Sequence, residues 1–462
     1  MSISLHSKQK EIVESPARYK VVRAGRRSGK TILQVEQMLF TAVSKKDRNI
    51  FYISPTQKQS RSIVWEALKK RVGDMGEANE GRLEMKLPTE DGGKSLIYLS
   101  GWENRENFRG LKADLIVFDE LDTMRNFFIG WQEIFRPALM DTKGKATFIG
   151  TPKKENPNLR RLEKEAKTNS DFGVFKFTTL DNPFIPDEEK RNAKIELDSQ
   201  SYQQEILAEY VENQGSLFKY ESLIDVFSNT VTKTGNKYLT VDVADDGSDK
   251  TIFSFWEDLE EYRREDFERL NTEGIISQIR EYASSDRIPY SHIAVDAIGV
   301  GAGVASSSML DGIVGYKSSY SAIKTDMSIV KLPNVSYLRS APLVSDYRNL
   351  RSQCLFTLAD LVNNHKIASR LDGRQKENII EELSAYQDIS KGDGKRMATR
   401  KEDIKELIGR SPDESDCWLQ RMYFLIKGRM THQDSPEGES VFDRQKEVFE
   451  NNKLNFEKNS TK

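Results

Sequence analysis

Residues 19–31 read YKVVRAGRRSGKT, an apolar strand that runs into a turn rich in glycine and serine and then into a helix. In such a pattern the backbone N–H groups around the two glycines surround a phosphate, the lysine reaches its outer oxygens, and the threonine offers a hydroxyl to magnesium. We therefore predict a nucleotide phosphate-binding loop. Its members are Gly25, Arg26, Arg27, Ser28, Gly29, Lys30 and Thr31.

A second segment, residues 114–120, reads DLIVFDE and ends an apolar strand in two acids. Asp119 is suited to hold the magnesium shell, and Glu120 to orient or deprotonate the attacking water. Alone, the glycine-containing loop could be an ordinary turn before a helix. Together with the acidic strand end, it predicts hydrolysis of ATP.

The loop departs from the usual pattern at Ala24, which stands where the first glycine is normally found and leaves the backbone fewer conformations. It also contains two consecutive arginines. The guanidinium of Arg26, four residues before Lys30, is placed to touch the γ-phosphate, a function usually given to an arginine finger.

The composition limits the classes of protein that fit. The chain has 462 residues, 37% hydrophobic and 31% charged, enough for two globular domains with or without a tail. It has no apolar run of membrane-spanning length and no signal-peptide pattern, so we expect a soluble, intracellular protein. Two cysteines and four histidines show no zinc-ligand spacing, which favours magnesium or manganese held by carboxylates.

Charge is balanced, with 70 basic and 72 acidic residues and a formal net charge of −2. No global basic field draws the chain to nucleic acid, so any DNA binding must use local patches. This argues mildly against a passive DNA-coating protein. It is neutral toward an enzyme that grips DNA transiently or as an oligomeric ring.

Short apolar strands alternate with helical stretches through the first part of the chain, which predicts a parallel sheet covered on both faces. The predicted strands are 19–23, 49–54, 95–100, 114–119, 146–150 and 174–179. Ligands gather at the carboxyl ends of such strands. The loop, the Asp119-Glu120 pair and Gly150-Thr151-Pro152 should all meet there.

The remaining chain divides into three parts. Residues 181–215 are charged and helical, typical of a lid or linker. A strand at 237–243 opens a second α/β region that continues through 292–296 to a helix starting near Ser411. The polar end has two open interpretations, a tail that is disordered or folds on a partner, and a surface helix docked on the second domain. We predict domains at 1–180, 181–215 and 216–430, with a tail at 431–462.

The second region carries acidic residues that local structure does not explain. Asp242 lies inside an apolar strand, where an unpaired carboxylate costs several kcal/mol, and Asp296 ends another. Near the start of the late helix, Ser411 and Glu414 form a predicted capping box and the helix dipole favours Asp413, but neither effect explains Asp416.

Two strand carboxylates and one helix carboxylate, Asp242, Asp296 and Asp416, suit a two-metal nuclease, whose ions bridge the scissile phosphate. Asp249 is a further candidate ligand, with a solvated turn as an equal alternative; for Asp245 and Asp246 the turn is favoured. The glycine-rich stretch 299–303 lacks the third glycine or alanine of a dinucleotide-binding loop, so that interpretation is rejected.

In this order of parts, over roughly residues 1–430, the chain resembles the large terminase subunit of tailed double-stranded DNA bacteriophages. Leu5 to Gln9 is similar to the family's adenine-reading segment, with Gln9 as the contact, and residues 24–31 to its deviant phosphate loop. Residues 54–56 and 115–120 resemble its next motif and its acidic strand, and Gly150-Thr151-Pro152 the motif thought to couple hydrolysis to movement. Residues 209–218 resemble its motor–nuclease junction, and Asp242, Asp296 and Asp416 its nuclease carboxylates.

The resemblance implies an N-terminal P-loop ATPase of the RecA/ASCE type, with a parallel sheet, and a C-terminal ribonuclease H-like α/β nuclease. ATP with Mg²⁺ would be bound with Thr151 among the contacts, and two Mg²⁺ or Mn²⁺ by the nuclease. The implied partners are double-stranded DNA, the portal of the procapsid, the small terminase subunit and, in a ring, further copies of a chain that is monomeric in solution. No membrane is implied, and the location would be the host cytoplasm with transient attachment at the portal.

A ring implies a trans-acting arginine. Arg109 is the first candidate and Arg105 and Arg125 follow, although a surface ion pair explains Arg109 equally well. A helicase-like translocase without nuclease activity shares the loop and the acidic pair, but it normally has a second ATPase-like lobe. A packaging component that binds ATP without cutting would require the three aspartates to be structural.

Overall fold

The computed structural model describes residues 5–153, 157–211, 215–244, 250–268, 270–323, 346–392 and 394–428. The chain separates into two compact units, Met1–Gln214 and Gly215–Lys462. Within the described part of the chain, none of the helices combines the length and the apolar character needed to cross a lipid bilayer. The predicted tail, 431–462, lies outside the described residues.

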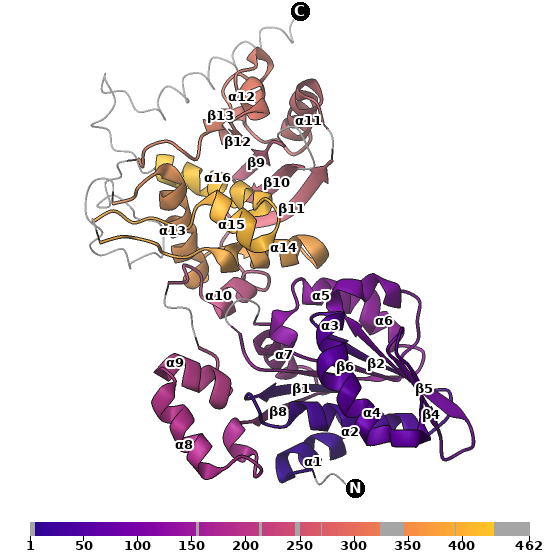
Figure 1. The fold of residues 1–462 in the computed structure, drawn as a ribbon. Helices are drawn as coiled ribbons and strands as arrows, with labels where there is room; N and C mark the ends of the chain where they lie inside the picture. Colours follow the sequence, from indigo (N-terminus) through magenta and orange to yellow (C-terminus); the bar gives the residue numbers. More distant parts are fainter. Residues whose placement is uncertain are drawn as a thin grey trace, which may run out of the picture. The chain divides into compact units, whose positions relative to one another are not determined.

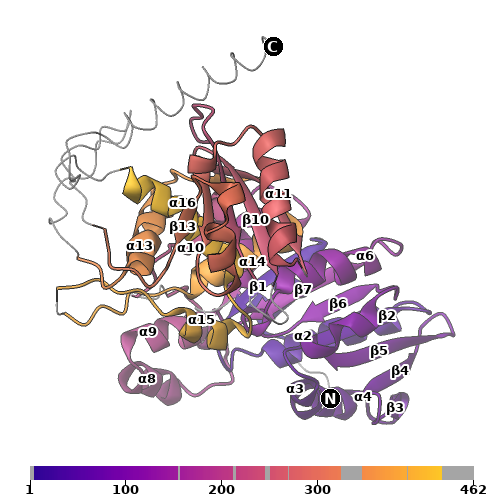
Figure 2. The same ribbon diagram turned by 90° about the horizontal axis from the view of Figure 1, so that it is seen from above.

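The first unit is built on an eight-stranded sheet with the order β3-β4-β5-β2-β6-β7-β1-β8 (Figures 1 and 2). From β5 to β8 every neighbouring pair is parallel, whereas β3 and β4 pair antiparallel at one edge. The strands are β1 (Tyr19–Ala24), β2 (Asn49–Ser54), β3 (Glu77–Asn79), β4 (Glu84–Pro88), β5 (Lys94–Gly101), β6 (Leu115–Phe118), β7 (Lys145–Gly150) and β8 (Phe172–Phe177).

Both faces of this sheet are buried. Along β1, Val22 packs into one apolar cluster and Val21 into another, because successive side chains of a strand point to opposite faces. Helices and short helical turns cover the two faces, which explains why the parallel strands are almost continuously apolar. The helices of this unit are α1 (Ser7–Glu14), α2 (Lys30–Val43), α3 (Gln57–Gln59), α4 (Glu66–Val72), α5 (Phe127–Gly130), α6 (Arg136–Ala138), α7 (Asn158–Ala166), α8 (Asp187–Glu196) and α9 (Ser199–Ser201).

The second unit has a six-stranded mixed sheet with the order β13-β12-β9-β10-β11-β14. Strands β9, β10 and β11 form an antiparallel meander, and β12 joins β9 in parallel on its other side, followed by β13. This is the α/β architecture that the ribonuclease H-like prediction requires. The strands are β9 (Lys237–Asp242), β10 (Thr251–Glu257), β11 (Glu260–Phe267), β12 (Ile293–Asp296), β13 (Val314–Tyr316) and β14 (Ala368–Ser369).

Helix α16, whose start was predicted near Ser411, packs on this sheet against β9 and contacts α13 and α14. It is amphipathic around a buried stripe that contains Trp418, Leu419 and Met422. The helices of the unit are α10 (Tyr220–Asp225), α11 (Thr272–Ser285), α12 (Val300–Ala305), α13 (Leu350–Asn363), α14 (Gly373–Ala385), α15 (Lys401–Ile408) and α16 (Asp413–Lys427).

The predicted fold class, α/β in both regions, is confirmed, and β2 has the predicted bounds. The sheet of the first unit is not wholly parallel, because the unpredicted pair β3 and β4 adds an antiparallel edge. In β3 all three residues are exposed and in β4 only two are buried, so these strands lack the apolar run that identified the others.

Candidate active sites

The phosphate-binding loop connects β1 to α2, and its two glycines are needed for different reasons. A Cβ on Gly25 would lie 2.6 Å from the carbonyl oxygen of Ile206 and 2.7 Å from Thr179 Oγ1, so only glycine fits. Gly29 has φ +100°, a conformation that side chains disfavour, and it caps α2 without a side chain. The first N–H groups of α2 are therefore left to bind an anion.

Lys30 brings the three predicted motifs of the first unit together. Its ammonium donates to Thr151 Oγ1 at 2.8 Å and to the carbonyl of Gly25 at 3.3 Å, and it pairs with Glu120 Oε1 at 3.3 Å. The contacts follow from the sheet order, because β7, which ends before Thr151, lies between β1 and β6. Without a nucleotide, the lysine is held by the residues that the sequence assigns to coordination and catalysis.

Asp119 is buried at the end of β6 and hydrogen-bonded on both oxygens. Tyr52 donates its hydroxyl to Oδ2 at 2.6 Å, and the Gln34 amide donates to Oδ1 at 2.7 Å. Burial and the neighbouring Glu120 raise the pKa of Asp119. Glu120 itself has a left-handed backbone, φ +50°, which turns the chain directly after the strand. A carboxylate fixed in this way, on a sheet edge beside Lys30, suits a magnesium shell.

The other predicted nucleotide contacts surround the loop. Gln9 donates its amide to the Gly29 carbonyl at 2.9 Å and accepts from His6 N, which ties α1 to the loop. Ser28 donates to the Gly25 carbonyl, and Thr31 lies in the first turn of α2. Arg27 has φ +56°, and its carbonyl accepts from Asn182.

The two arginines proposed to touch the terminal phosphate are occupied in the isolated chain. Arg26 pairs with Glu205 at 2.5 Å. Arg109 pairs with Glu106 at 2.6 Å and Glu133 at 3.0 Å on the surface, with about half of its side chain exposed. The surface ion pair that the sequence left open therefore describes Arg109 in a single chain.

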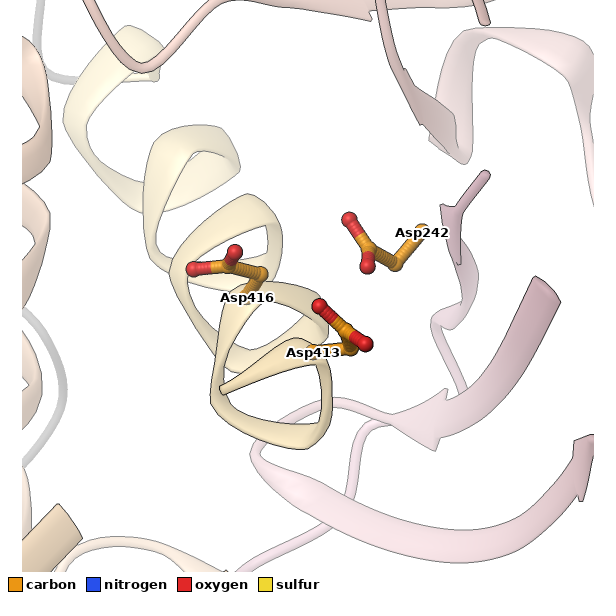
Figure 3. Close-up of side chains that lie close together, drawn as sticks. All are labelled: Asp242, Asp413 and Asp416. Atoms are coloured by element: carbon orange, nitrogen blue, oxygen red, sulfur yellow. The ribbon is translucent and has the colours of Figure 1, made fainter. Parts of the chain in front are cut away.

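In the second unit, Asp242 at the end of β9 faces Asp413 and Asp416 on the first turn of α16 (Figure 3). One carboxylate oxygen from each lies within 4.8 Å of the other two. Asp296, at the end of β12, lines the same cavity of about 510 Å³ as these three residues. Asp249 and its neighbours Asp245 and Asp246 lie outside the described residues.

Two cations are held within this acidic cluster. Lys401 donates to Asp416 Oδ2 at 2.7 Å and pairs with Asp413 Oδ1 at 3.4 Å, while Arg351 donates to Asp416 Oδ1 at 2.6 Å. Burial acts to raise the pKa of Asp416, but Arg351 and Lys401 outweigh it and lower this pKa. Asp242 is not within ion-pair distance of either cation; burial raises its pKa well above normal, and Lys401 opposes this only partly.

This charge distribution fits a divalent cation. Oxygen ligands from several carboxylates are what Mg²⁺ and Mn²⁺ prefer. The raised pKa of Asp242 also means that concentrated negative charge is costly here unless a cation neutralises it. The donor set therefore passes the chemical test for a metal site, although the lysine already offsets part of its charge.

The start of α16 is used differently from the sequence prediction, which was wrong on this point. Ser411 and Glu414 do not form a capping box: α16 begins after Pro412 without a side-chain cap, and the Ser411 hydroxyl donates to Asp413. Asp413, which the helix dipole was expected to explain, belongs to the acidic cluster. Its spacing of three residues from Asp416 places both on one helix face, a signal that could have identified it.

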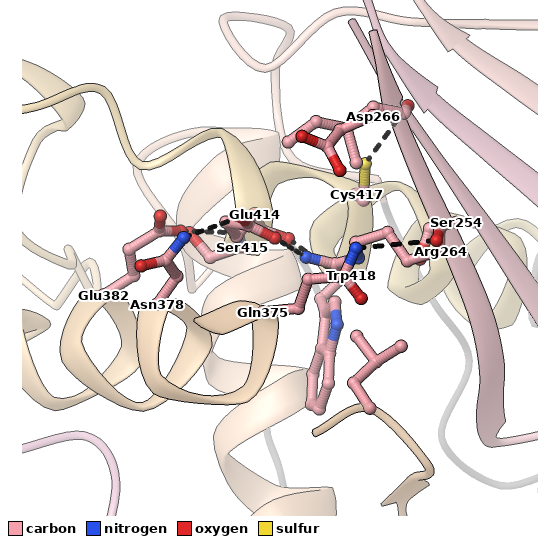
Figure 4. Close-up of polar contacts among 12 residues, drawn as sticks. Ser254, Arg264, Asp266, Gln375, Asn378, Glu382, Glu414, Ser415, Cys417 and Trp418 are labelled. Carbon is pink, nitrogen blue, oxygen red and sulfur yellow. Dashed lines mark hydrogen bonds and ion pairs between the residues drawn. The ribbon is translucent and has the colours of Figure 1, made fainter. Parts of the chain in front are cut away.

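Glu414 points to the other side and helps to anchor α16 (Figure 4). It accepts from Asn378 at 3.0 Å and pairs with buried Arg264, which also pairs with Glu261 at 2.6 Å. Trp418 donates its indole N–H to Glu261 at 2.8 Å. This network fixes the helix that carries Asp413 and Asp416.

The chain has recognisable relatives among known proteins. Residues 21–224 match the family model described as "Terminase large subunit, T4likevirus-type, N-terminal". The chain is 23% identical over 376 residues to the large terminase subunits of Thermus virus P23-45 and Thermus phage G20c; each alignment covers 72% of this chain and 76% of the relative. These two findings confirm the resemblance that the sequence motifs indicated.

Solved structures of similar fold include the large terminase of a thermophilic bacteriophage, with a TM-score of 0.42 and 15% identity over 91% of this chain and 100% of that one. The ATPase domain of the Thermus phage P74-26 large terminase has a TM-score of 0.39 and 22% identity, and it covers 45% of this chain and 94% of its own length.

Proposed function

Because the chain resembles the large subunit of phage terminases, we propose that it is a viral DNA-packaging motor, which uses ATP hydrolysis to move double-stranded DNA into a procapsid and cuts the concatemer with a metal-dependent endonuclease. One observation carries the proposal. A single chain holds a phosphate-binding loop joined to an acidic strand end through Lys30 and, in its second unit, a cluster of three carboxylates that a divalent ion fits.

In the motor unit, each residue has a role that follows from its position. ATP with Mg²⁺ supplies the phosphoryl group and, through the ion, stabilises developing charge. The N-terminus of α2 and Lys30 bind the phosphates, Thr31 and Asp119 hold the magnesium shell, and Glu120 orients the attacking water. Lys30 now pairs with Glu120. Binding of phosphate by Lys30 would break that pair and leave Glu120 available as a base.

Thr151 is the residue best placed to report on the phosphate. Its hydroxyl accepts from Lys30 and donates to the carbonyl of Ala24, and its N–H lies 3.5 Å from Glu120 Oε2. A change at Lys30 therefore reaches the end of β7 directly. This supports a coupling role for Gly150-Thr151-Pro152 in translocation.

In the nuclease unit, Asp242, Asp296, Asp413 and Asp416 would hold two Mg²⁺ or Mn²⁺, with Asp249 as a further candidate. Such ions supply the nucleophile and stabilise the leaving oxygen of a phosphodiester. Arg351 fixes the orientation of Asp416 and itself donates to Tyr386 at 2.7 Å. The Lys401 ammonium lies in the cavity wall, where it can neutralise charge on a bound phosphate.

Assembly completes the proposal. The chain would form a ring at the portal, recruited from the host cytoplasm with the small terminase subunit, and Arg109 would leave Glu106 and Glu133 to act on the nucleotide of a neighbouring copy. Arg105 stacks on Trp102 at 5.3 Å, and the backbone carbonyl of Arg125 accepts from the same indole. Arg109 has no comparable aromatic contact in the described part of the chain, so it is the better candidate.

A triplex-displacement assay separates this motor from a helicase. The purified chain is given ATP and a linear duplex that carries a third-strand oligonucleotide. Movement along duplex DNA releases the third strand and leaves the duplex intact, and Glu120→Gln abolishes the release. Separation of the two duplex strands would instead identify a helicase-like translocase and contradict the proposal.

A further inference from the structure

Glu205 lies between two cations of the proposed nucleotide site. It belongs to the helical turn Tyr202–Ile206, in the segment predicted as a lid. Its Oε1 accepts from Lys153 Nζ at 2.6 Å, and its Oε2 lies 2.5 Å from Arg26 Nε. Only 17% of the Glu205 side chain is exposed. One carboxylate therefore neutralises a cation of the phosphate-binding loop and a cation just after β7.

The backbone holds this carboxylate in place. Arg26 N donates to the carbonyl of Glu205 at 2.7 Å, and the next carbonyl, that of Ile206, is the atom against which Gly25 packs. Thr179 adds a hydrogen bond to the carbonyl of Arg26 at 2.6 Å. The segment around residue 205 and the phosphate-binding loop thus form one tightly packed arrangement in the nucleotide-free chain.

The two ion pairs differ in strength. The Lys153 contact is a hydrogen-bonded pair and lies largely out of solvent, with 21% of the lysine side chain exposed. In contrast, 68% of the Arg26 side chain is exposed, and Glu205 Oε2 accepts no aligned hydrogen bond. An exposed pair of this kind is weak, so a stronger anion can replace it.

Both cations lie close to where an outer phosphate would sit. Lys30 marks the β- and γ-phosphates of a nucleotide in such a loop. Arg26 is in the same loop, and Lys153 follows Thr151, which accepts from Lys30. Burial tends to raise the pKa of Glu205, but Lys153 and Arg26 outweigh it and lower this pKa, so the carboxylate is ionised and competes for these cations at neutral pH.

We propose, on the premise of the ATPase function above, that Glu205 is an internal competitor of the terminal phosphate. It holds Arg26 and Lys153 in the nucleotide-free and diphosphate-bound chain and yields them to a nucleoside triphosphate. Glu205 therefore sets how strongly the chain distinguishes ATP from ADP. Loss of its contacts on ATP binding also frees the lid segment from the loop.

The test compares the dissociation constants of ATPγS and ADP, each with Mg²⁺, by calorimetry on the full chain. In Glu205→Gln, the competing charge is gone but the size is kept. ATPγS should then bind about three- to tenfold more tightly than in the wild type, the size of a typical coupling between charged sites, with little change for ADP. Glu205→Ala should change the ratio in the same direction.

Glu163→Gln is the matched control. The Glu163 side chain is also 17% exposed, and it pairs with Arg23 of β1 at 3.0 Å rather than with Arg26 or Lys153. Its ratio of ADP to ATPγS dissociation constants should equal that of the wild type. An equal gain for both nucleotides in Glu205→Gln, or no gain, would overturn the inference alone. Absence of ATPγS binding by the wild type would overturn the proposed function and the inference with it.

Discussion

Asp413 shows, at the residue scale, how one acidic side chain can satisfy two physical explanations at once. A carboxylate in the first turn of a helix is stabilised by the helix dipole, which was a sufficient account from the sequence. The structure adds that its oxygen lies within 4.8 Å of oxygens from Asp242 and Asp416. Because Asp242 comes from a strand distant in sequence, only the folded chain reveals that Asp413 completes a cluster.

Lys401 was missed for a different reason. It lies in a charged stretch, and nothing in its local sequence separates it from an ordinary surface lysine. In the fold, it is drawn to Asp416 and Asp413, which outweigh the effect of burial and raise its pKa. By contrast, Lys30 and Glu120 could be identified in advance, because loop and strand motifs fix where such residues must meet.

We predict that Asp413→Asn reduces Mn²⁺-dependent DNA cleavage at least about tenfold, because loss of a ligand weakens metal binding. Part of the activity should return at high Mn²⁺ concentration. Asp311→Asn, which changes an exposed acid elsewhere in the second unit, is the control. If Asp413→Asn cuts DNA at the wild-type rate at all Mn²⁺ concentrations, the residue serves only the helix dipole.

At the scale of elements, the sequence predicted the buried parallel strands and missed most of the antiparallel ones. Strand β2, Asn49–Ser54, is apolar on both faces and was found with its bounds. Strand β11, Glu260–Phe267, reads EEYRREDF and has a charged residue at six positions. Its buried acids are tolerated because Arg264 pairs with Glu261 and Arg370 with Glu260, partners that no local pattern reveals.

The buried network behind α16 gives a stability prediction. Arg264→Met leaves Glu261 and Glu414 buried without their cation, and loss of one partner of a buried ion pair costs about 3–5 kcal/mol. Arg263→Met is the neighbouring control; its side chain is 38% exposed and its pair with Asp286 contributes about 1 kcal/mol. Denaturant unfolding of both variants measures the difference, and equal costs would show that the buried network does not anchor the helix.

The attachment of α1 gives a pH prediction. Lys20 in β1 is buried and donates to the carbonyls of Ile12 and Val13 at the end of α1, and burial, aided by Lys145, lowers its pKa to about 8. An unfolded lysine titrates near pH 10.4. Between these values the unfolded chain binds a proton that the folded chain has released, so the contribution of Lys20 to stability rises with pH.

This contribution has a maximum slope of about 1.4 kcal/mol per pH unit between pH 8 and 10.4. The stability of the wild type minus that of Lys20→Met should therefore increase over this range. Thermal unfolding of both proteins at pH 7.5, 8.5 and 9.5 checks it. A difference that does not change with pH would mean that Lys20 titrates normally and is not buried as a cation.

At the scale of the whole molecule, the two proposed chemistries reside in different units. Lys30, Glu120 and Thr151 lie in Met1–Gln214, whereas Asp242, Asp413 and Asp416 lie in Gly215–Lys462. Each unit has its own apolar clusters on both faces of its own sheet. A substitution in one site therefore leaves the core of the other unit intact, and the two activities should be separable.

The most direct test measures plasmid cleavage with Mn²⁺ and ATP hydrolysis in the same preparations of wild type, Asp242→Asn and Lys30→Ala. The wild type should cut and hydrolyse, Asp242→Asn should hydrolyse without cutting, and Lys30→Ala should cut without hydrolysing. Cleavage at the wild-type rate by Asp242→Asn, or undiminished hydrolysis by Lys30→Ala, would contradict the assignment of two independent active sites to this chain.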